Sequence, residues 1–197
     1  MSYNSKTQDK NIAWYLPRPK PDHYKGGMPL YAEEWLLDLA RDIIQKPGAH
    51  ILNLFCGMNR QGFRVDIKPD VKPDIVCDAH TLSNCIKETF DVIFADPPYS
   101  NQEAKEIYGT PNLKYKTWTA EAEKLLNKGG LLIVYHKRIM PNPNPEIFRI
   151  IKRVFLGNRV NHPPRVALYF HKKPIVQGSL FTDNKPVQRT LNNVPLT

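Results

Sequence analysis

Short apolar runs recur along the first half of the chain, and each one stops at a glycine or an acidic residue. The runs at 50–55, 62–66, 74–78 and 91–95 have the length and composition of buried β-strands. The segment at 31–46 has a different pattern, since its apolar side chains recur at the spacing of one helical face. The first half therefore predicts one amphipathic helix followed by four strands.

The second half continues with further helices and strands. A helix is expected from about Thr119 to the glycine pair at 129–130, followed by a strand over 130–137. Pro145 suits the first turn of another helix within 140–151. Two last strands, near 153–157 and 165–172, are joined by a loop that holds the Asn-His-Pro-Pro run and are expected to pair antiparallel.

Strands that alternate with helices predict the fold class. The expected fold is α/β: a seven-stranded, mostly parallel sheet with an antiparallel last strand and helices on both faces. At 197 residues one domain is the natural count. Its expected limits are 25–173, with an extended proline-containing arm at 1–24 and a loose tail at 174–197.

Composition narrows the class of protein. Apolar residues make up 41% of the chain, and no stretch approaches the ~20 apolar residues that a membrane span needs. The first residues lack the apolar core of a signal peptide, so a cytoplasmic protein with no membrane partner is expected. Three cysteines cannot all pair, and none falls in a Cys-x-x-Cys motif, so reduced thiols are expected.

The net charge of +9 is concentrated near the end of the predicted domain. From 137 to 173 the sequence holds nine basic residues and one acid, Glu146, a local excess of 9 − 1 = +8. A basic face of this kind suits a polyanion such as nucleic acid. A solvated surface that keeps the protein soluble explains the charge equally well.

Chemistry-bearing residues gather at the strand ends. Gly57, Asp66, Asp78 and Asp96 each follow a predicted strand. Ligands of parallel sheets bind beyond the carboxyl ends of the strands. Gly57 alone would suit a plain tight turn, but Asp66 can accept hydrogen bonds from ribose hydroxyls and Asp78 from the amino group of an adenine. Together they suit a nucleoside cofactor laid across three strands.

The motifs "ILNLFCG", "VDI", "CDAHTL" and "DVIFADPPYS" together resemble a class I S-adenosylmethionine-dependent methyltransferase, over residues 24–173. The last motif is similar to that of the DPPY-type amino-methyltransferases of adenine or cytosine. The short, basic chain looks like small phage-borne or prophage-borne DNA methyltransferases. The resemblance implies a Rossmann-like fold and S-adenosylmethionine as cofactor. The chain departs from the family after Gly57, where Met58-Asn59-Arg60 follows and the G-x-G motif is not continued, so a turn or short helix is expected before Asp66.

The resemblance also implies cofactor-binding residues. The segment "HYKGGMP" is similar to the one that closes over the methionine end of the cofactor, although a basic loop that caps a helix is an equal alternative. The implied residues are Lys25, Gly26, Gly27, Phe55, Cys56, Gly57, Asp66, Ile67, Asp78, Ala79 and Asp96.

Asp96, Pro97, Pro98 and Tyr99 are the predicted catalytic residues. The exocyclic amine of a base is a poor nucleophile, because its lone pair is delocalised into the ring. Asp96 and the carbonyl of Pro97 would accept its two N–H groups and localise that pair, with the prolines holding the carbonyl in place. Tyr99 would offer a ring face to the base, and Tyr108 is a second candidate for substrate binding.

Several alternatives stay open at this point. Two prolines can simply end a strand that Asp96 caps, and an aspartate at a strand end can hold a metal ion in other enzymes. No metal site is expected, since Cys77 and His80 lack partners in the sequence. The expected reaction is N6-methylation of adenine in DNA, with an RNA base methyltransferase or a non-catalytic nucleic-acid-binding protein as alternatives. A homodimer partner could supply recognition of the target.

Overall fold

The computed structural model describes residue 28 and residues 30–157 and 164–174. A seven-stranded sheet runs through this region in the order β3-β2-β1-β4-β5-β7-β6. Neighbours from β3 to β5 pair parallel, while β7 pairs antiparallel with both β5 and β6. The predicted fold class, mostly parallel with an antiparallel last strand, is confirmed.

The strands have these bounds: β1 Ile51–Leu54, β2 Phe63–Asp66, β3 Ile75–Val76, β4 Phe90–Ala95, β5 Leu126–His136, β6 Phe148–Leu156 and β7 Arg165–Lys172. The helices are α1 Leu30–Ile44, α2 Leu82–Cys85, α3 Asn101–Glu106 and α4 Tyr115–Leu125, with short 3₁₀ turns η1 Pro69–Val71 and η2 Ala79–Thr81. No helix was predicted over α2 or α3, whose sequences are too short to show a helical period.

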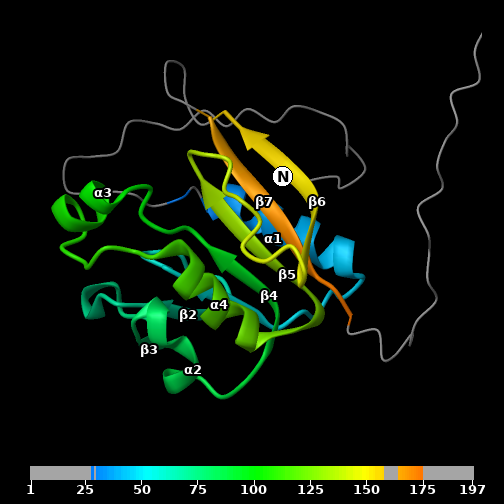
Figure 1. Cartoon of the computed structure of the whole chain (residues 1–197), viewed down its shortest axis with the longest axis horizontal. Helices are drawn as coiled ribbons and strands as arrows, with labels where there is room; N and C mark the ends of the chain where they lie inside the picture. The colour runs from blue at the N-terminus through cyan, green and yellow to red at the C-terminus, as the bar shows by residue number, and fades with distance from the viewer. Residues whose placement is uncertain (1–27, 29, 158–163, 175–197) are drawn as a thin grey trace, which may run out of the picture.

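Two apolar clusters cover the two faces of the sheet. Alternation along β4 sends Val92 and Phe94 to the cluster with α1, and Ile93 to the cluster with α4. Figure 1 shows α1 on one face of the sheet and α4 with α2 on the other. The buried hydroxyl of Tyr169 donates to the α1 carbonyl of Leu36 at 2.9 Å, which ties this helix to β7.

The predicted helix at 140–151 is wrong. Pro145 lies in a turn, and the chain enters strand β6 at Phe148. β-Branched residues at 150, 151 and 154 favour a strand. The pairing of β6 with β7 from Phe148↔Lys172 to Leu156↔Arg165 supplies hydrogen bonds that an isolated helix turn lacks.

Helix α4 also differs from its predicted bounds. It begins at Tyr115 and not near Thr119, and it ends at Leu125, four residues before the glycine pair. The glycine pair lies inside β5, because Leu126 already pairs with Phe90 of β4. Gly129 takes a positive φ of 75° there, so its freedom serves an irregular strand and not a helix stop.

The expectation of three reduced cysteines is wrong for two of them. Cys77 and Cys85 form a disulfide, and Cys56 is free and buried. The η2–α2 turn folds back so that the two Cα atoms lie 6.5 Å apart, within the range that a disulfide bridges. Nothing in the spacing of eight residues reveals this fold-back.

Gly62 occupies a position that only glycine tolerates. Its φ is +71°, and an added Cβ would lie 2.6 Å from the carbonyl oxygen of Ile51. We expect Gly62→Ala to lower the free energy of unfolding by about 2–3 kcal/mol, measured by chemical denaturation. Gly48→Ala is the matched control, since nothing lies within 4 Å of its added Cβ. An equal loss in both variants would contradict the assignment.

None of the helices in the described part of the chain is both long and apolar enough to cross a membrane.

Candidate active site

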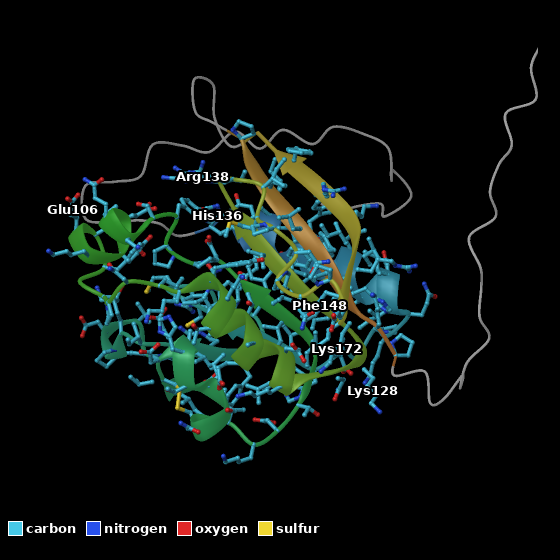
Figure 2. The ribbon with its side chains drawn as sticks, viewed as in Figure 1. Glu106, Lys128, His136, Arg138, Phe148 and Lys172 are labelled. Atoms are coloured by element: carbon cyan, nitrogen blue, oxygen red, sulfur yellow. A yellow bond between two sulfur atoms is a disulfide. The ribbon has the colours of Figure 1, made fainter. Side chains whose placement is uncertain are left out.

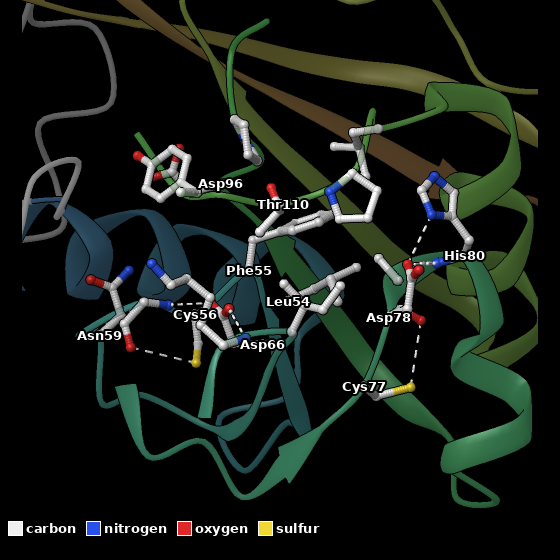
Figure 3. Close-up of a pocket in the computed structure, with 18 of the residues that line it drawn as sticks. Leu54, Phe55, Cys56, Asn59, Asp66, Cys77, Asp78, His80, Asp96 and Thr110 are labelled. Carbon is white, nitrogen blue, oxygen red and sulfur yellow. Dashed lines mark hydrogen bonds and ion pairs between the residues drawn. The ribbon is translucent and has the colours of Figure 1, made fainter. Parts of the chain in front are cut away.

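The carboxyl ends of β1 to β4 open into one cleft. Its empty volume is about 800 Å³, part of it open to solvent. The predicted residues that line it are Phe55, Cys56, Gly57, Asp66, Ile67, Asp78, Ala79, Asp96, Pro98 and Tyr108. Figure 3 shows Asp96 on one side of the cleft and Asp66 and Asp78 across from it. Residues far apart in the sequence therefore meet here.

Asp66 shapes the turn that follows β1. Its Oδ2 accepts from the Gly57 amide at 2.9 Å, and its Oδ1 accepts from the Lys68 amide at 2.9 Å. Gly57 has a φ of +48°, which glycine adopts at little cost. The turn between β1 and β2 contains no helix, as the short spacing predicts. Each oxygen keeps a second lone pair for a ligand hydroxyl.

Asp78 joins the cleft to the segment before α4. Its Oδ1 accepts from the His80 amide at 2.9 Å and contacts His80 Nδ1 at 2.8 Å. The other ring nitrogen, Nε2, accepts from the Lys114 amide at 2.9 Å. A neutral His80 therefore carries its ring proton on Nδ1 and donates a hydrogen bond from there to Asp78 Oδ1. Sequence analysis did not identify His80 as part of the cleft.

Asp96 lies directly beyond β4 and is partly exposed to the cleft. Burial raises the pKa of Asp96 to about 8, although a hydrogen bond from the Tyr99 hydroxyl and the Arg165 guanidinium act to lower it. Buried carboxyl groups with raised pKa values are frequent at functional sites. The charge state of Asp96 thus depends on its burial and on Tyr99 and Arg165.

Tyr99 lies beside the cleft in contact with basic side chains. Its ring packs edge-on against His136, and Lys137 Nζ and Arg165 Cζ lie 5.4 and 4.8 Å from its centroid. Arg165 Nε also donates to the Tyr99 hydroxyl at 3.2 Å. Of the four motif residues, Asp96 and Pro98 line the cleft, whereas Pro97 and Tyr99 are not among the lining residues. Stacking of a base on Tyr99 stays a prediction.

A helix cap fixes the end of the motif. Ser100 Oγ accepts from the Glu103 amide at 3.1 Å, and Glu103 Oε2 accepts from the Tyr99 amide at 2.8 Å. This is close to a capping box, in which the cap and the third helical residue satisfy each other's backbone. The Ser-x-x-Glu spacing after the prolines is a signal in the sequence that could have predicted α3.

Several other lining residues were not predicted. The segment after α3 contributes Thr110, Pro111 and Leu113, in addition to Tyr108. Thr110 Oγ1 donates to the Ala104 carbonyl at 3.1 Å, which holds this segment against α3. Of this segment, only Tyr108 was predicted from the sequence. Lys25, Gly26 and Gly27 fall outside the described residues.

The basic segment 137–173 divides into two parts. Arg138 and His136 lie at the carboxyl end of β5, at the opposite end of the sheet from Lys172 and Lys128 (Figure 2). Lys172 Nζ donates to the carbonyls of Glu123 and Leu126 and so serves to end α4. Lys137 and Arg138 are instead exposed after β5, and Lys137 Nζ lies over the Tyr99 ring.

Metal ligation finds no support in the described region, where no group of three or more His, Cys, Asp or Glu side chains could hold an ion. The cleft is lined instead by apolar side chains and three separate carboxylates.

No protein-family model and no curated protein matches the sequence. Solved structures do match the fold. TrmN from Thermus thermophilus has a TM-score of 0.55 and 18% identity, over 75% of this chain and 50% of that chain. The present chain thus spans half the length of TrmN. N-methyltransferase NodS from Bradyrhizobium japonicum WM9, in complex with S-adenosyl-l-homocysteine, has a TM-score of 0.53 and 14% identity, over 78% of this chain and 93% of that chain.

The TM-scores of 0.55 and 0.53, at identities of 18% and 14%, show a shared fold and nothing finer. The seven-stranded sheet with its antiparallel β7 is the fold that the sequence motifs imply, and that expectation is confirmed. The chain therefore has the Rossmann-like fold of these methyltransferase structures.

Proposed function

We propose that the protein transfers a methyl group from S-adenosylmethionine to the exocyclic amino group of a nucleic-acid base, with adenine N6 in DNA as the expected target. The observation that carries this proposal is the position of Asp96. It lies across one cleft from Asp66 and Asp78, so a group on the cofactor side can meet a group on the Asp96 side.

The residues of the cleft fit a nucleoside cofactor. Asp66 would accept from the ribose hydroxyls with its remaining lone pairs, and Asp78 would accept from the adenine amino group with its Oδ2. Apolar lining from Ile67, Ala79 and Leu113 suits the flat base. S-Adenosylmethionine, when bound, supplies a methyl group on a positively charged sulfur. This fit supports the cofactor that the sequence motifs imply.

Asp96 would prepare the amine for attack. As a carboxylate it accepts one amine N–H, and the carbonyl of Pro97 accepts the other, which concentrates the lone pair on nitrogen. The amine would then accept the methyl group that the sulfonium of the cofactor supplies, which would leave a neutral thioether, and would pass one proton to the Asp96 carboxylate that already accepts its N–H. The protein contributes orientation above all, an effect that reaches about 7–11 kcal/mol in well-ordered reactions. A base in duplex DNA must first leave the stack.

Tyr99 is expected to favour the ionised form of Asp96. Its hydroxyl hydrogen bond lowers the pKa of Asp96, so Tyr99→Phe removes a stabilising partner of the carboxylate. We expect the midpoint of the acidic limb of the rate profile to move to higher pH, with activity at neutral pH reduced about tenfold. Steady-state rates from pH 5 to 9 measure this shift.

Tyr115→Phe is the matched control, because its hydroxyl donates to the Pro141 carbonyl at 2.7 Å and is not one of the groups that shift the pKa of Asp96. An unchanged midpoint in Tyr99→Phe would contradict the role given to its hydroxyl.

The reaction is tested with methyl-labelled cofactor. The protein is incubated with separate pools of duplex DNA, single-stranded DNA and RNA, and each pool is digested to nucleosides. Label in N6-methyladenosine of DNA supports the full proposal, whereas label in RNA alone moves the target to RNA. Label on a ring carbon contradicts the amine as acceptor. Calorimetry without any heat of cofactor binding would leave a nucleic-acid-binding protein without turnover.

Binding of the nucleic acid is assigned to the exposed cations beside Tyr99. Lys137 and Arg138 follow β5 at the end of the sheet where the cleft opens, and both are exposed. Phosphate contacts of this kind are not specific for sequence and weaken with salt. The rest of the basic segment contributes less, since Lys172 is committed to the end of α4.

A further inference from the structure

A buried acid and a buried amide meet between α1 and β1. Glu33 and Asn53 are both 0% exposed. Asn53 Nδ2 donates to Glu33 Oε1 at 2.5 Å and to the Gln61 carbonyl at 3.2 Å. The amide thereby uses both of its N–H groups. This pair belongs to none of the functional residues predicted from the sequence.

The same two side chains hold two unsatisfied acceptors. Glu33 Oε2 and Asn53 Oδ1 are buried and find no hydrogen-bond partner among the described residues. An unsatisfied buried polar atom costs about 1–3 kcal/mol, and more when it is charged. Two acceptors cannot satisfy each other, so an ionised Glu33 would leave both of them unpaired.

A single proton on Glu33 would give both unpaired oxygens a hydrogen-bond partner. When Oε2 carries a proton, it can donate to Asn53 Oδ1 while Oε1 accepts from Asn53 Nδ2. A neutral carboxyl group and an amide then pair through two antiparallel hydrogen bonds, and no charge is buried. The geometry already contains one of the two bonds.

The charged neighbours leave burial as the dominant effect. Burial is the largest cause of the raised pKa of Glu33, which is about 7 after the smaller raising effect of Glu34 and the lowering effects of the Asn53 hydrogen bond and Arg64. Asp96 is the other carboxyl group in electrostatic contact, since Glu33 in its charged form raises the pKa of Asp96. Of two interacting carboxyl groups, each in its charged form raises the pKa of the other.

We propose that Glu33 is a proton-carrying positioning residue: its neutral carboxyl pairs with Asn53, joins α1 to β1, and keeps a second negative charge away from Asp96. The part that concerns Asp96 rests on the proposed function, whereas the proton on Glu33 does not. The expected consequence is that Glu33 stays neutral at low pH and, once it ionises near pH 7, opposes the ionisation of Asp96, whose pKa is about 8.

The proton on Glu33 is tested without any substrate. Infrared difference spectra of the wild type minus Glu33→Gln at pH 6 are expected to show the carbonyl band of a protonated carboxyl group. The band should disappear as pH rises through the titration of Glu33. Glu33→Gln retains the shape and both hydrogen bonds of the neutral acid, so it should restore the unfolding temperature that Glu33→Ala loses.

The influence on Asp96 is tested by the pH profile of methyl transfer. Glu33→Gln is expected to move the acidic midpoint to lower pH, because the charge that opposes ionisation of Asp96 can no longer form. A role in packing alone would change the rate without moving the midpoint. Asp42→Asn is the matched control, since it removes an exposed carboxyl group from the same helix that does not act on the pKa of Glu33 or Asp96.

Two outcomes overturn the proposal. Absence of the protonated-carboxyl band in the wild type would show that Glu33 is ionised at pH 6. An unmoved midpoint in Glu33→Gln would remove its influence on Asp96. If no nucleic acid accepts a methyl group, the proposed function fails, while the infrared and unfolding results still decide whether Glu33 carries the proton.

Discussion

Replacement of Asp96 by asparagine is expected to lower the rate of methyl transfer about 10²–10⁴-fold. Asparagine fills the same volume, but it carries no charge and presents one N–H₂ group that repels the N–H groups of the target amine. Orientation of the amine and localisation of its lone pair are both lost. Single-turnover rates with saturating cofactor and oligonucleotide measure the effect on the chemical step.

Cofactor binding should survive this change, since Asp66, Asp78 and Gly57 keep their contacts on the other side of the cleft. Calorimetry of Asp96→Asn is therefore expected to give a dissociation constant within about threefold of the wild type. Glu106→Gln is the matched control, because this exposed carboxylate at the end of α3 (Figure 2) lies outside the cleft lining. Undiminished transfer in Asp96→Asn would end the proposed role of the carboxylate.

Glu33 is expected to make the protein less stable as pH rises. Its pKa in the folded protein, about 7, lies above its ordinary value of 4.5. The folded state therefore binds the proton more tightly than the unfolded state. The stability from the protonated pair is fully present below pH 4.5 and is lost as pH rises through about 7.

Between pH 5 and 8 this loss amounts to roughly 2–3 kcal/mol, since one pKa unit corresponds to about 1.4 kcal/mol. Glu33→Gln cannot ionise, so it should become more stable than the wild type at pH 8 by this amount. An increase of about 5–10 °C in unfolding temperature is expected for a chain of this size. Asp96 has a raised pKa in both proteins, so its own contribution largely cancels. Parallel pH curves for the two proteins would contradict the prediction.

The sequence by itself determined the first four strands along the chain and the residues at their ends. The ends of apolar runs of four to six residues can be identified in the sequence, because the residue after each run marks where the chain leaves the sheet. Gly57, Asp66, Asp78 and Asp96 were found in this way, and the parallel sheet explains why they meet at one edge. The fold implied by the motifs followed from the same residues.

Only the tertiary structure decided contacts between segments without a shared pattern. Strand β6 forms because it pairs with β7, although Pro145 ahead of it also suited the first turn of a helix. The Cys77–Cys85 disulfide depends on a fold-back in η2 and α2 that no local signal marks. The Glu33–Asn53 pair joins two amphipathic elements whose sequences give no sign that their polar side chains meet. Burial and pairing over long distances set these features, because their energies depend on neighbours that the linear order does not specify.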